Sequence, residues 1–400
     1  MIKREIEKKF MRLSKSRKIV LITGARQVGK STFIKEFIDE ERQYVTLDDM
    51  NLRTLAKEDP QMFLMNYKGS LIIDEVQYAP ELFPYIKMNV DNSEKKGQYF
   101  LTGSQKFELM KNVTESLAGR VSILELSSLS YAEKKGFSSN IFNPLKIKNR
   151  IKVTPIEIFN DIYIGGMPEY ISNNLDKNEF FSDYVTTYLE RDVRNIANVG
   201  DLNSFRKFMI AVASRNGEVL NYSSLCEDAD IDNKTAKRWL SILEASDIIY
   251  LLEPYFNSSL KRATKSPKIV FLDSGLCSYL CGWNSGENIM NSSVSGHYLE
   301  TFVISELIKN KRNNEASLNY DVYFYRDKDG KKIDLIIKLD DVIYPFEIKK
   351  TASPNKSMIN NFSILKNKNM NIGNGGLICF YPDIIPLDEN NKSYPISVIF

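Results

Sequence analysis

A glycine-rich segment near the amino terminus has the residue types that bind phosphate. Residues 24–31 fit the pattern GxxxxGK[ST] at every fixed position. The apolar run Ile19–Ile22 precedes this segment and the helix-prone run Thr32–Ile38 follows it, as the pattern requires. Glycines let backbone N–H groups wrap a β-phosphate, and the start of a helix favours negative charge. We expect Lys30 to reach the β- and γ-phosphates of a nucleotide and Ser31 to bind magnesium.

A second segment ends in two carboxylates that can complete this site. The apolar run Leu71–Ile73 leads into Asp74 and Glu75. Asp74 can hold magnesium through water, and Glu75 can polarise the attacking water. The alternative is a chance loop beside an ordinary strand, but both halves occur in their proper context, so we expect ATP binding and hydrolysis with ATP and Mg²⁺ as cofactors. The expected nucleotide contacts are Gly24, Ala25, Arg26, Gln27, Val28, Gly29, Lys30, Ser31 and Thr32.

Short apolar runs alternate with helical stretches over the first 130 residues. They are rich in β-branched or aromatic residues, and their flanks carry turn residues or charge, which is typical of buried parallel strands joined by helices. The pattern predicts a three-layer α/β domain. The predicted strands are Lys18–Thr23, Tyr44–Leu47, Leu71–Ile73, Tyr99–Leu101 and Val121–Leu126.

With these motifs, the amino-terminal segment resembles the AAA+ ATPases. Tyr99–Ser104 is similar to the sensor-1 strand, which implies that Ser104, or else Thr102, contacts the γ-phosphate or the lytic water. Arg120 ends the stretch Leu117–Arg120, where AAA+ proteins carry an arginine finger that reaches a neighbouring subunit. The resemblance therefore implies a homo-oligomer formed through the ATPase domain. The alternative for Arg120 is a helix-terminal cation favoured by the helix dipole.

The resemblance extends along most of the chain, with one departure. AAA+ lids often carry a sensor-2 arginine in a G-x-R sequence, and the lid here has none; Arg191 and Arg194 are either substitutes for it or part of an exposed ion-paired face. The chain as a whole resembles a prokaryotic family that joins this ATPase module to a carboxy-terminal domain of unassigned function. The further matching stretches are Gly165–Tyr170 and Tyr188–Val193.

The middle of the chain predicts a winged helix-turn-helix, with three short helices followed by the strands Ile249–Phe256 and Lys268–Leu272. Its recognition helix would run over Lys234–Ala245 after an N-cap at Asp232 or Asn233. The expected DNA contacts at its start are Lys234, Thr235, Lys237 and Arg238. A protein-interaction module is the alternative, because nearby acidic residues would repel phosphate. These are Glu227, Asp228, Asp230 and Asp232.

The carboxy-terminal part resembles the PD-(D/E)xK nuclease fold. Strands are predicted near Val322–Tyr325, Ile333–Leu339, Val342–Ile348, Leu377–Tyr381 and Ile396–Phe400. Glu347 and Lys349 are two residues apart on one strand face, and Asp334 precedes Glu347 by thirteen residues (347 minus 334). The resemblance implies that Asp334 and Glu347 bind Mg²⁺, that Lys349 stabilises the transition state, and that Glu300 completes the site. The alternative is a charged sheet edge.

Length and composition bound these expectations. A length of 400 residues predicts several domains. The 54 basic and 51 acidic residues nearly balance, so the net charge neither demands nor excludes a nucleic-acid partner. A single histidine and four cysteines without a CxxC pair argue against a zinc ribbon. The absence of a signal peptide and of a long apolar run predicts a cytoplasmic protein with no membrane association. The predicted domains are the ATPase core (1–150), a helical lid (151–200), the winged helix (201–275) and the nuclease-like domain (276–400).

Three functions are compatible with these motifs. The first is an ATP-driven machine that acts on DNA. The second is an ATP-dependent switch that acts on a protein partner and carries an inert carboxy-terminal domain. The third, a metabolic phosphoryl transferase, is disfavoured because such kinases rarely combine a winged helix with an ExK domain.

Overall fold

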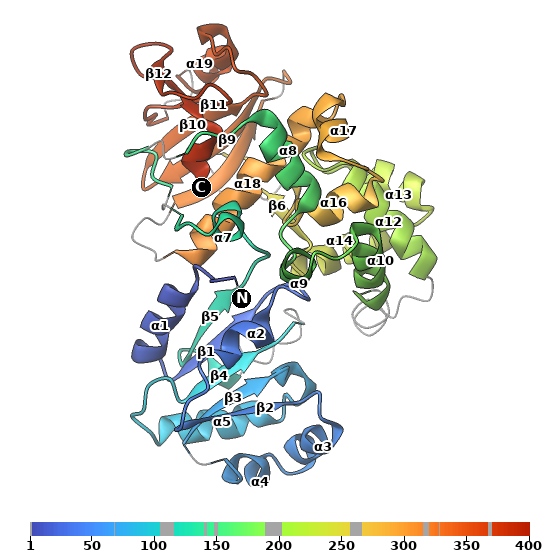
Figure 1. Cartoon of the computed structure of the whole chain (residues 1–400), viewed down its shortest axis with the longest axis vertical. Helices are drawn as coiled ribbons and strands as arrows, with labels where there is room; N and C mark the ends of the chain where they lie inside the picture. Colours follow the sequence, from blue (N-terminus) through green and yellow to red (C-terminus); the bar gives the residue numbers. More distant parts are fainter. Residues whose placement is uncertain are drawn as a thin grey trace.

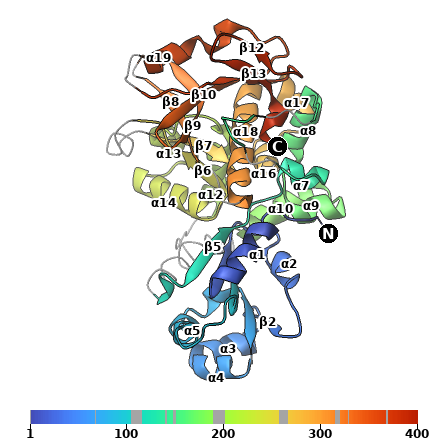
Figure 2. The same cartoon turned by 90° about the vertical axis from the view of Figure 1, so that its left-hand side faces the viewer.

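The computed structural model describes residues 2–67, 69–104, 116–139, 142–147, 151–188, 202–256, 266–314, 320–327, 329–366 and 370–400. Figure 1 shows one sheet with its helices at the bottom, a second sheet at the top and a group of helices on the right. Helix α18 (Ser295–Asn313) lies between these three parts, and the turned view in Figure 2 also places it there.

The amino-terminal sheet is five-stranded and fully parallel, in the order β2-β3-β4-β1-β5. All five predicted strands are confirmed, with shifts of only a few residues at their ends. The strands are β1 (Ile19–Thr23), β2 (Arg42–Thr46), β3 (Ser70–Asp74), β4 (Tyr99–Thr102) and β5 (Val121–Glu125). Because β1 and β3 lie next to β4, the residues that follow their carboxyl ends meet at one edge of the sheet.

Helices cover both faces of this sheet, so the predicted three layers are confirmed. Alternation along β1 directs Ile19 and Leu21 to one face and Val20 and Ile22 to the other, and two separate hydrophobic cores result. The first core takes side chains from α3 (Met50–Glu58), α4 (Pro60–Met65), the 3-10 turn η1 (Val76–Tyr78) and α5 (Leu82–Asp91). The second core takes them from α1 (Glu7–Ser16) and α2 (Lys30–Lys35).

The middle of the chain is mostly helical and contains a two-stranded hairpin. Its helices are α7 (Tyr131–Lys135), α8 (Pro155–Ile164), α9 (Pro168–Asn173), α10 (Lys177–Tyr188), α12 (Leu202–Ser214), α13 (Tyr222–Ala229), α14 (Asn233–Ala245), α16 (Ser274–Leu280) and α17 (Gly286–Asn291). The hairpin pairs β6 (Ile249–Leu252) with β7 (Lys268–Phe271). Capping boxes open α7 at Ser130 and α8 at Thr154, so the local sequence fixes these two helix starts.

The order of three helices and a hairpin agrees with the expected elements. The N-cap of α14 is Asp232, whose carboxylate accepts hydrogen bonds from the N–H groups of Lys234 (2.7 Å) and Thr235 (3.0 Å). Trp239, Leu240 and Leu243 are buried, as predicted for the inner side of this helix. Strand β6 ends earlier than predicted, just before Glu253 and Pro254, because proline cannot donate a hydrogen bond to a ladder.

The carboxy-terminal part contains a six-stranded sheet that lies next to α18 (Ser295–Asn313). Its strands, in the order β12-β13-β11-β10-β9-β8, are β8 (Tyr320–Arg326), β9 (Lys332–Leu339), β10 (Val342–Ile348), β11 (Gly376–Cys379), β12 (Ile385–Pro386) and β13 (Lys392–Pro395). The 3-10 helix η3 (Lys356–Phe362) and α19 (Ser363–Lys366) precede β11. The predicted strand at Ile396–Phe400 is wrong: these residues follow Pro395 and form the buried 3-10 turn η4 (Ile396–Ile399). A short, wholly apolar run does not distinguish a strand from a buried helical turn.

One continuous hydrophobic core joins the middle and carboxy-terminal parts. It includes Tyr131 on α7, whose ring stacks on Phe400 with a centroid separation of 4.2 Å, and Phe142, whose ring contacts Phe346 on β10. The segment directly after β5 therefore packs with the carboxy-terminal elements. Among the described residues, no helix combines the length and apolar character that a membrane crossing needs.

Candidate functional site

The glycine-rich loop joins β1 to α2 through backbone conformations that its glycines permit. Gly24 has φ +143°, and a Cβ atom at this position would lie 2.1 Å from the carbonyl oxygen of Leu126. Gly29 has φ +90° and is the N-cap of α2. A side chain at either position would be strained, so the glycines set the path of the loop. The loop therefore leads directly into the start of a helix, where backbone N–H groups can receive a phosphate.

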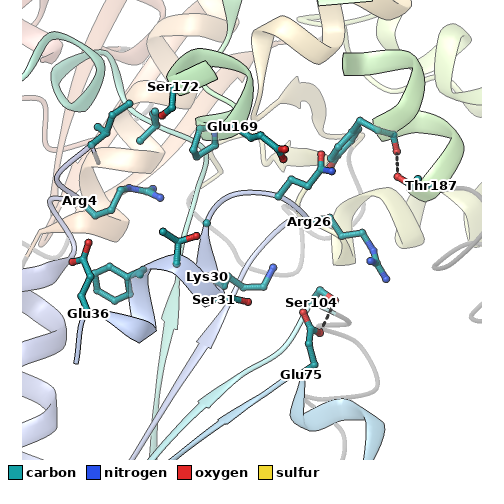
Figure 3. Close-up of a pocket in the computed structure, with 18 residues that line it drawn as sticks. Arg4, Arg26, Lys30, Ser31, Glu36, Glu75, Ser104, Glu169, Ser172 and Thr187 are labelled. Atoms are coloured by element: carbon teal, nitrogen blue, oxygen red, sulfur yellow. Dashed lines mark hydrogen bonds between the residues drawn. The ribbon is translucent and has the colours of Figure 1, made fainter. Parts of the chain in front are cut away.

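A cavity of about 780 Å³ lies over this loop (Figure 3). Figure 3 shows Lys30 and Ser31 at its centre, with Glu75 and Ser104 on one side and Glu169 and Ser172 on the other. The cavity thus collects residues from the loop, from the ends of two neighbouring strands and from the helical segment. Its lining is Ile2, Arg4, Arg26, Gln27, Gly29, Lys30, Ser31, Thr32, Phe33, Glu36, Glu75, Ser104, Leu129, Pro168, Glu169, Ser172, Tyr184 and Thr187.

Lys30 occupies the interior of the loop. Its side chain is buried, and its ammonium donates hydrogen bonds to the carbonyl oxygens of Gly24 (3.1 Å) and Ala25 (2.7 Å). A lysine ammonium has three donors, and a buried charge needs partners. The loop carbonyls hold the ammonium at the cavity, where it is placed to meet phosphate oxygens.

Asp74 is buried and held by two hydroxyl groups. Tyr44 on β2 donates a hydrogen bond of 2.8 Å to Asp74 Oδ2, and Thr102 on β4 donates to Asp74 Oδ1. Burial, together with the hydrogen bond to this carboxylate, raises the pKa of Tyr44, so its hydroxyl stays protonated as the donor. The carboxylate of Asp74 and the hydroxyl of Ser31 are oxygen ligands of the kind that magnesium prefers, so their chemistry fits this ion.

Glu75 follows in a left-handed conformation, with φ 58°, which turns it away from the strand. Its N–H donates to Thr102 Oγ1 (3.1 Å), and Ser104 Oγ lies 3.4 Å from Glu75 Oε2. The amide of Gln77 also donates to Glu75 Oε2. Both sensor-1 candidates thus contact the acidic strand: Thr102 fixes the backbone and Asp74, while Ser104 lines the cavity beside Glu75.

Sequence reasoning missed several residues of this cavity. Tyr44 donates a hydrogen bond to Asp74, and Gln77 donates one to Glu75. The sequence could have indicated Tyr44 only if the order of β2, β3 and β4 in the sheet had been known. Arg4 lies before the first strand, outside the residues that the phosphate-loop pattern specifies. The helical segment contributes Glu169 and Ser172 from α9, near the Gly165–Tyr170 stretch that resembled the family. Arg191 and Arg194, the possible sensor-2 substitutes, lie outside the described residues.

Arg120 lies away from this cavity. It precedes Val121, which pairs with Ile19 at the amino-terminal end of β1, whereas the glycine-rich loop follows the carboxyl end of the same strand. Its guanidinium makes a two-pronged ion pair with Asp91, with Nε···Oδ1 at 2.5 Å and Nη2···Oδ2 at 3.0 Å. A five-residue strand separates the two ends of β1 by ~15 Å.

On α14, the candidate DNA-binding side chains lie at the surface. Lys234, Lys237 and Arg238 are exposed, while the hydroxyl of Thr235 donates to Asp232 Oδ2 at 2.7 Å. The ammonium of Lys237 lies 5.6 Å from the ring centre of Tyr222. Of the neighbouring acids, Asp228 pairs with Arg215 at 2.6 Å. Three basic side chains of the helix are therefore accessible to a partner, next to an acidic turn.

In the carboxy-terminal part, three of the four predicted site residues come together. The ammonium of Lys349 lies 2.8 Å from Asp334 Oδ2 and 2.7 Å from Glu347 Oε2, and both carboxylates are buried. The N–H of Ile348 also donates to Asp334 Oδ2 (3.1 Å). Glu347 Oε1 is buried and receives no hydrogen bond from any described residue. Asp334, Glu347 and Lys349 are called the acidic cluster below.

Burial and adjacent charge set the ionisation of this acidic cluster. Burial, then the nearby carboxylate of Asp334, raises the pKa of Glu347 to about 8. Burial acts in the same direction on Asp334, but Lys349 and Glu347 outweigh it and hold the pKa of Asp334 well below its usual range. The pair therefore shares one negative charge more readily than two.

Glu300, which was expected to complete the site, pairs with a lysine of the hairpin. Its buried carboxylate accepts a hydrogen bond from the ammonium of Lys268, a buried residue on β7 of the hairpin. Burial raises the pKa of Glu300. In the described parts of the chain, no three histidine, cysteine or acidic residues are grouped as a metal site. Asp334 and Glu347 have the chemistry of metal ligands, while Glu300 is already bound by a lysine.

Comparisons with known proteins divide the chain into three matched regions. Residues 16–134 match the family model described as AAA domain. Residues 157–287 match a domain of unknown function, DUF8612, and residues 295–399 match another, DUF4143.

Related chains come from bacteria and an archaeon. Uncharacterized proteins of Mycobacterium bovis and Mycobacterium tuberculosis are each 28% identical over 342 residues, which are 85% of this chain and 72% of theirs. An uncharacterized protein of Methanocaldococcus jannaschii is 23% identical over 344 residues, covering 76% of this chain and 71% of its own.

Two solved structures are also similar in part. The RuvB Holliday junction branch migration motor of Thermotoga maritima has a TM-score of 0.31 at 15% identity and covers 62% of this chain and 88% of its own. A STAND signal-transduction ATPase of Pyrococcus horikoshii has a TM-score of 0.27 at 13% identity and covers 78% of this chain and 47% of its own. The family match, the complete phosphate-loop motif and the parallel sheet agree: residues 16–134 form a P-loop ATPase domain of the AAA type.

Proposed function

We propose that this protein binds ATP with Mg²⁺ in the cavity over the glycine-rich loop and hydrolyses it there. The observation that carries the proposal is the meeting of Lys30, Glu75 and Ser104 at one cavity. Lys30 would bind the β- and γ-phosphates, Glu75 would accept a proton from the attacking water, and Ser104 would orient that water beside Glu75. Magnesium, when bound, neutralises phosphate charge, and Ser31 and Asp74 would hold it.

Phosphate release from ATP by the purified protein tests this proposal. Lys30→Ala removes the buried cation of the loop, so ATP binding and hydrolysis are both expected to disappear. Lys57→Ala, a change at an exposed lysine of α3, serves as the matched control and keeps both. Hydrolysis that survives Lys30→Ala would contradict the assignment of the cavity.

The active unit of this proposal is a homo-oligomer formed through the ATPase domain. Arg120 lies at the far end of β1 from its own loop, so it can act on a nucleotide only from a neighbouring copy. An arginine supplied in this way stabilises the charge on the transferring phosphoryl group. Sedimentation with and without ATP tests assembly, and a monomer under both conditions would contradict it.

The partner of this machine in our proposal is DNA, bound through α14. The exposed side chains of Lys234, Lys237 and Arg238 support it, since cations at the start of a helix can meet the phosphate backbone. A joint change of Lys237 and Arg238 to alanine should weaken duplex binding and reduce its salt dependence. Lys207→Ala on α12 is the control. Unchanged DNA affinity would remove DNA binding from this helix.

The alternative is an ATP-dependent switch for a protein partner, and the acidic turn before α14 favours it. ATPase rates with and without duplex DNA separate the two functions. Strong stimulation supports the DNA-associated machine, and indifference supports the switch.

A second activity, Mg²⁺-dependent cleavage of nucleic acid, is proposed for the acidic cluster. The convergence of Asp334, Glu347 and Lys349 supports it, and the resemblance to PD-(D/E)xK nucleases supplies the fold. Asp334 and Glu347 would hold the ion. Incubation with plasmid and Mg²⁺ or Mn²⁺ tests the activity. No cleavage, or cleavage that survives Asp334→Ala, would leave the cluster as an inert part of a binding module.

A further inference from the structure

Arg4, which lies before the first strand, has a buried guanidinium beside the glycine-rich loop. It donates to the carbonyl oxygens of Val28 (2.7 Å) and Ser127 (2.6 Å) and to Glu133 Oε1 (3.1 Å). Glu133 is itself fully buried. Three of the five N–H donors of one guanidinium thus bind three segments that are far apart in the sequence.

From this arrangement we infer that Arg4 is a positioning residue of the nucleotide site. The C=O and N–H groups of one trans peptide unit point in opposite directions. Because Arg4 holds the carbonyl of Val28, it also fixes the direction of the N–H of Gly29, which points away from Arg4. This N–H belongs to the loop that receives the β-phosphate, so Arg4 sets the orientation of a phosphate donor without contacting the phosphate. The inference rests on the proposed ATP site.

The ion pair with Glu133 extends this support to the carboxy-terminal part. Glu133 Oε1 also accepts from the N–H of Glu5 (2.8 Å), and Glu133 Oε2 accepts from the N–H of Ser130 (2.9 Å), so its carboxylate is fixed at the start of α7. At the same helix start, the N–H of Tyr131 donates to Glu306 Oε2 on α18 (2.8 Å). A short series of buried hydrogen bonds therefore runs from the phosphate loop through α7 to α18.

This series continues back to the cavity wall. Lys309, one turn after Glu306 on α18, is 3.0 Å from Glu306 Oε1 and donates to the carbonyl oxygen of Leu129 (3.1 Å), a residue that lines the cavity. Buried charges left without partners are costly, so these groups hold one another in a fixed arrangement. A shift of the loop on nucleotide binding should therefore change the position or the mobility of α18.

Titration with ADP and with AMP tests the positioning role. ADP carries the β-phosphate and AMP lacks it. Arg4→Ala and Arg4→Lys should raise the Kd for ADP by about tenfold or more, as expected for loss of a charged hydrogen bond. The Kd for AMP should stay nearly unchanged. Lys3→Ala, at a side chain that is 84% exposed and pairs with Glu7, is the control and should change neither.

The outcomes separate this inference from the proposed function. If wild-type protein binds neither ADP nor ATP, the ATP site fails. If it binds them and folded Arg4→Lys protein binds ADP equally well, or loses ADP and AMP affinity by the same factor, the positioning role is wrong. Thermal melts establish folding, and Arg4→Lys decides the question if Arg4→Ala does not fold.

Hydrogen exchange tests the extension to α18. Saturating ADP should slow amide exchange in residues 295–313 of the wild type. Glu133→Gln keeps the shape of the side chain and removes its charge, so this effect on α18 should be lost while the loop itself remains protected. Protection of α18 that survives the change would overturn the link.

Discussion

The hydroxyl of Tyr44 donates a hydrogen bond of 2.8 Å to Asp74 Oδ2, and so ties the second strand of the sheet to the acidic residue at the end of the third. With the hydroxyl of Thr102 on the other oxygen, the carboxylate of Asp74 has a fixed orientation. The aspartate that should hold magnesium is thus oriented by two neighbouring strands.

Tyr44→Phe is expected to weaken the use of magnesium. The change removes one hydrogen bond from a buried carboxylate at a cost of ~1–3 kcal/mol. ATP hydrolysis should then need several-fold more Mg²⁺ for half-maximal rate, while nucleotide binding without Mg²⁺ stays unchanged. A magnesium titration of the hydrolysis rate measures this. Tyr85→Phe, at a ring that packs against the same sheet, is the control. An unaltered magnesium dependence would show that Tyr44 has only a packing role.

Arg120→Ala should leave ATP binding intact and lower hydrolysis about a thousandfold or more, as for loss of an arginine finger. Mixing two inactive variants tests whether Arg120 acts on the site of a neighbouring subunit. Arg120→Ala subunits retain a complete loop, and Lys30→Ala subunits retain the arginine, so a mixture should regain part of the activity that neither variant has alone. If the mixture is as inactive as its components, Arg120 does not act across an interface.

The ion pair between Asp91 and Arg120 should limit the rate of ATP hydrolysis. The guanidinium must leave Asp91 before it reaches a neighbouring nucleotide. Asp91→Asn removes this competing partner, and because exposed ion pairs contribute little to stability, the fold should tolerate the change. Hydrolysis should become faster at equal protein concentration. A slower rate would indicate that Asp91 holds Arg120 in its working position.

The buried pair of Lys268 and Glu300 should be strongly coupled. Lys268→Met alone or Glu300→Gln alone leaves one partner buried without its counter-charge, which costs ~3–5 kcal/mol. The double variant should recover much of that loss. Denaturant unfolding of the four proteins measures the coupling, with Lys311→Ala at an exposed ion pair as control. Additive effects of the two single changes would contradict a direct pair.

Lys177 is expected to make the stability of the fold depend on pH. Burial lowers the pKa of this lysine on α10 to about 7, although Asp273 acts in the opposite direction. Its ammonium donates to Ser278 Oγ (2.7 Å) and lies 3.3 Å from the ring centre of Tyr163. The folded state therefore favours the neutral amine, while the unfolded chain keeps the ordinary pKa of 10.5.

The sign of the effect follows from proton binding. Between these two pKa values the unfolded state binds more protons, so the contribution of Lys177 to stability rises from about pH 7 to 10.5. Lys177→Met should raise the melting temperature at pH 7 by a few degrees and flatten this rise. Melting curves from pH 6 to 10 measure both. A variant as pH-dependent as the wild type would show that Lys177 is not the cause.

Local signals explain what the sequence predicts well. The five parallel strands and the phosphate loop follow from apolar runs, glycines and one lysine that act within a few residues of each other. The N-cap at Asp232 and the buried side of α14 are likewise local. The family resemblance supplied the roles of Ser104 and Arg120, which stay predictions.

The unpredicted contacts depend on residues that are distant in sequence. Tyr44 reaches Asp74 across a strand pair, Arg4 reaches Glu133 across 129 positions, and Lys268 pairs with Glu300 across 32 positions. No local pattern encodes these pairs. The apolar end of the chain failed for another reason, because its fully buried residues carry no periodicity that separates a strand from a 3-10 turn.

The central claim is that the cavity over the glycine-rich loop hydrolyses ATP through Glu75. ATP binding and phosphate release measured side by side for wild type and Glu75→Gln test it most directly. We predict similar Kd values for ATP and a release rate at least ~100-fold lower in the variant, as for loss of a general base. A variant that hydrolyses ATP at the wild-type rate, or a wild type that binds no ATP, would contradict the account.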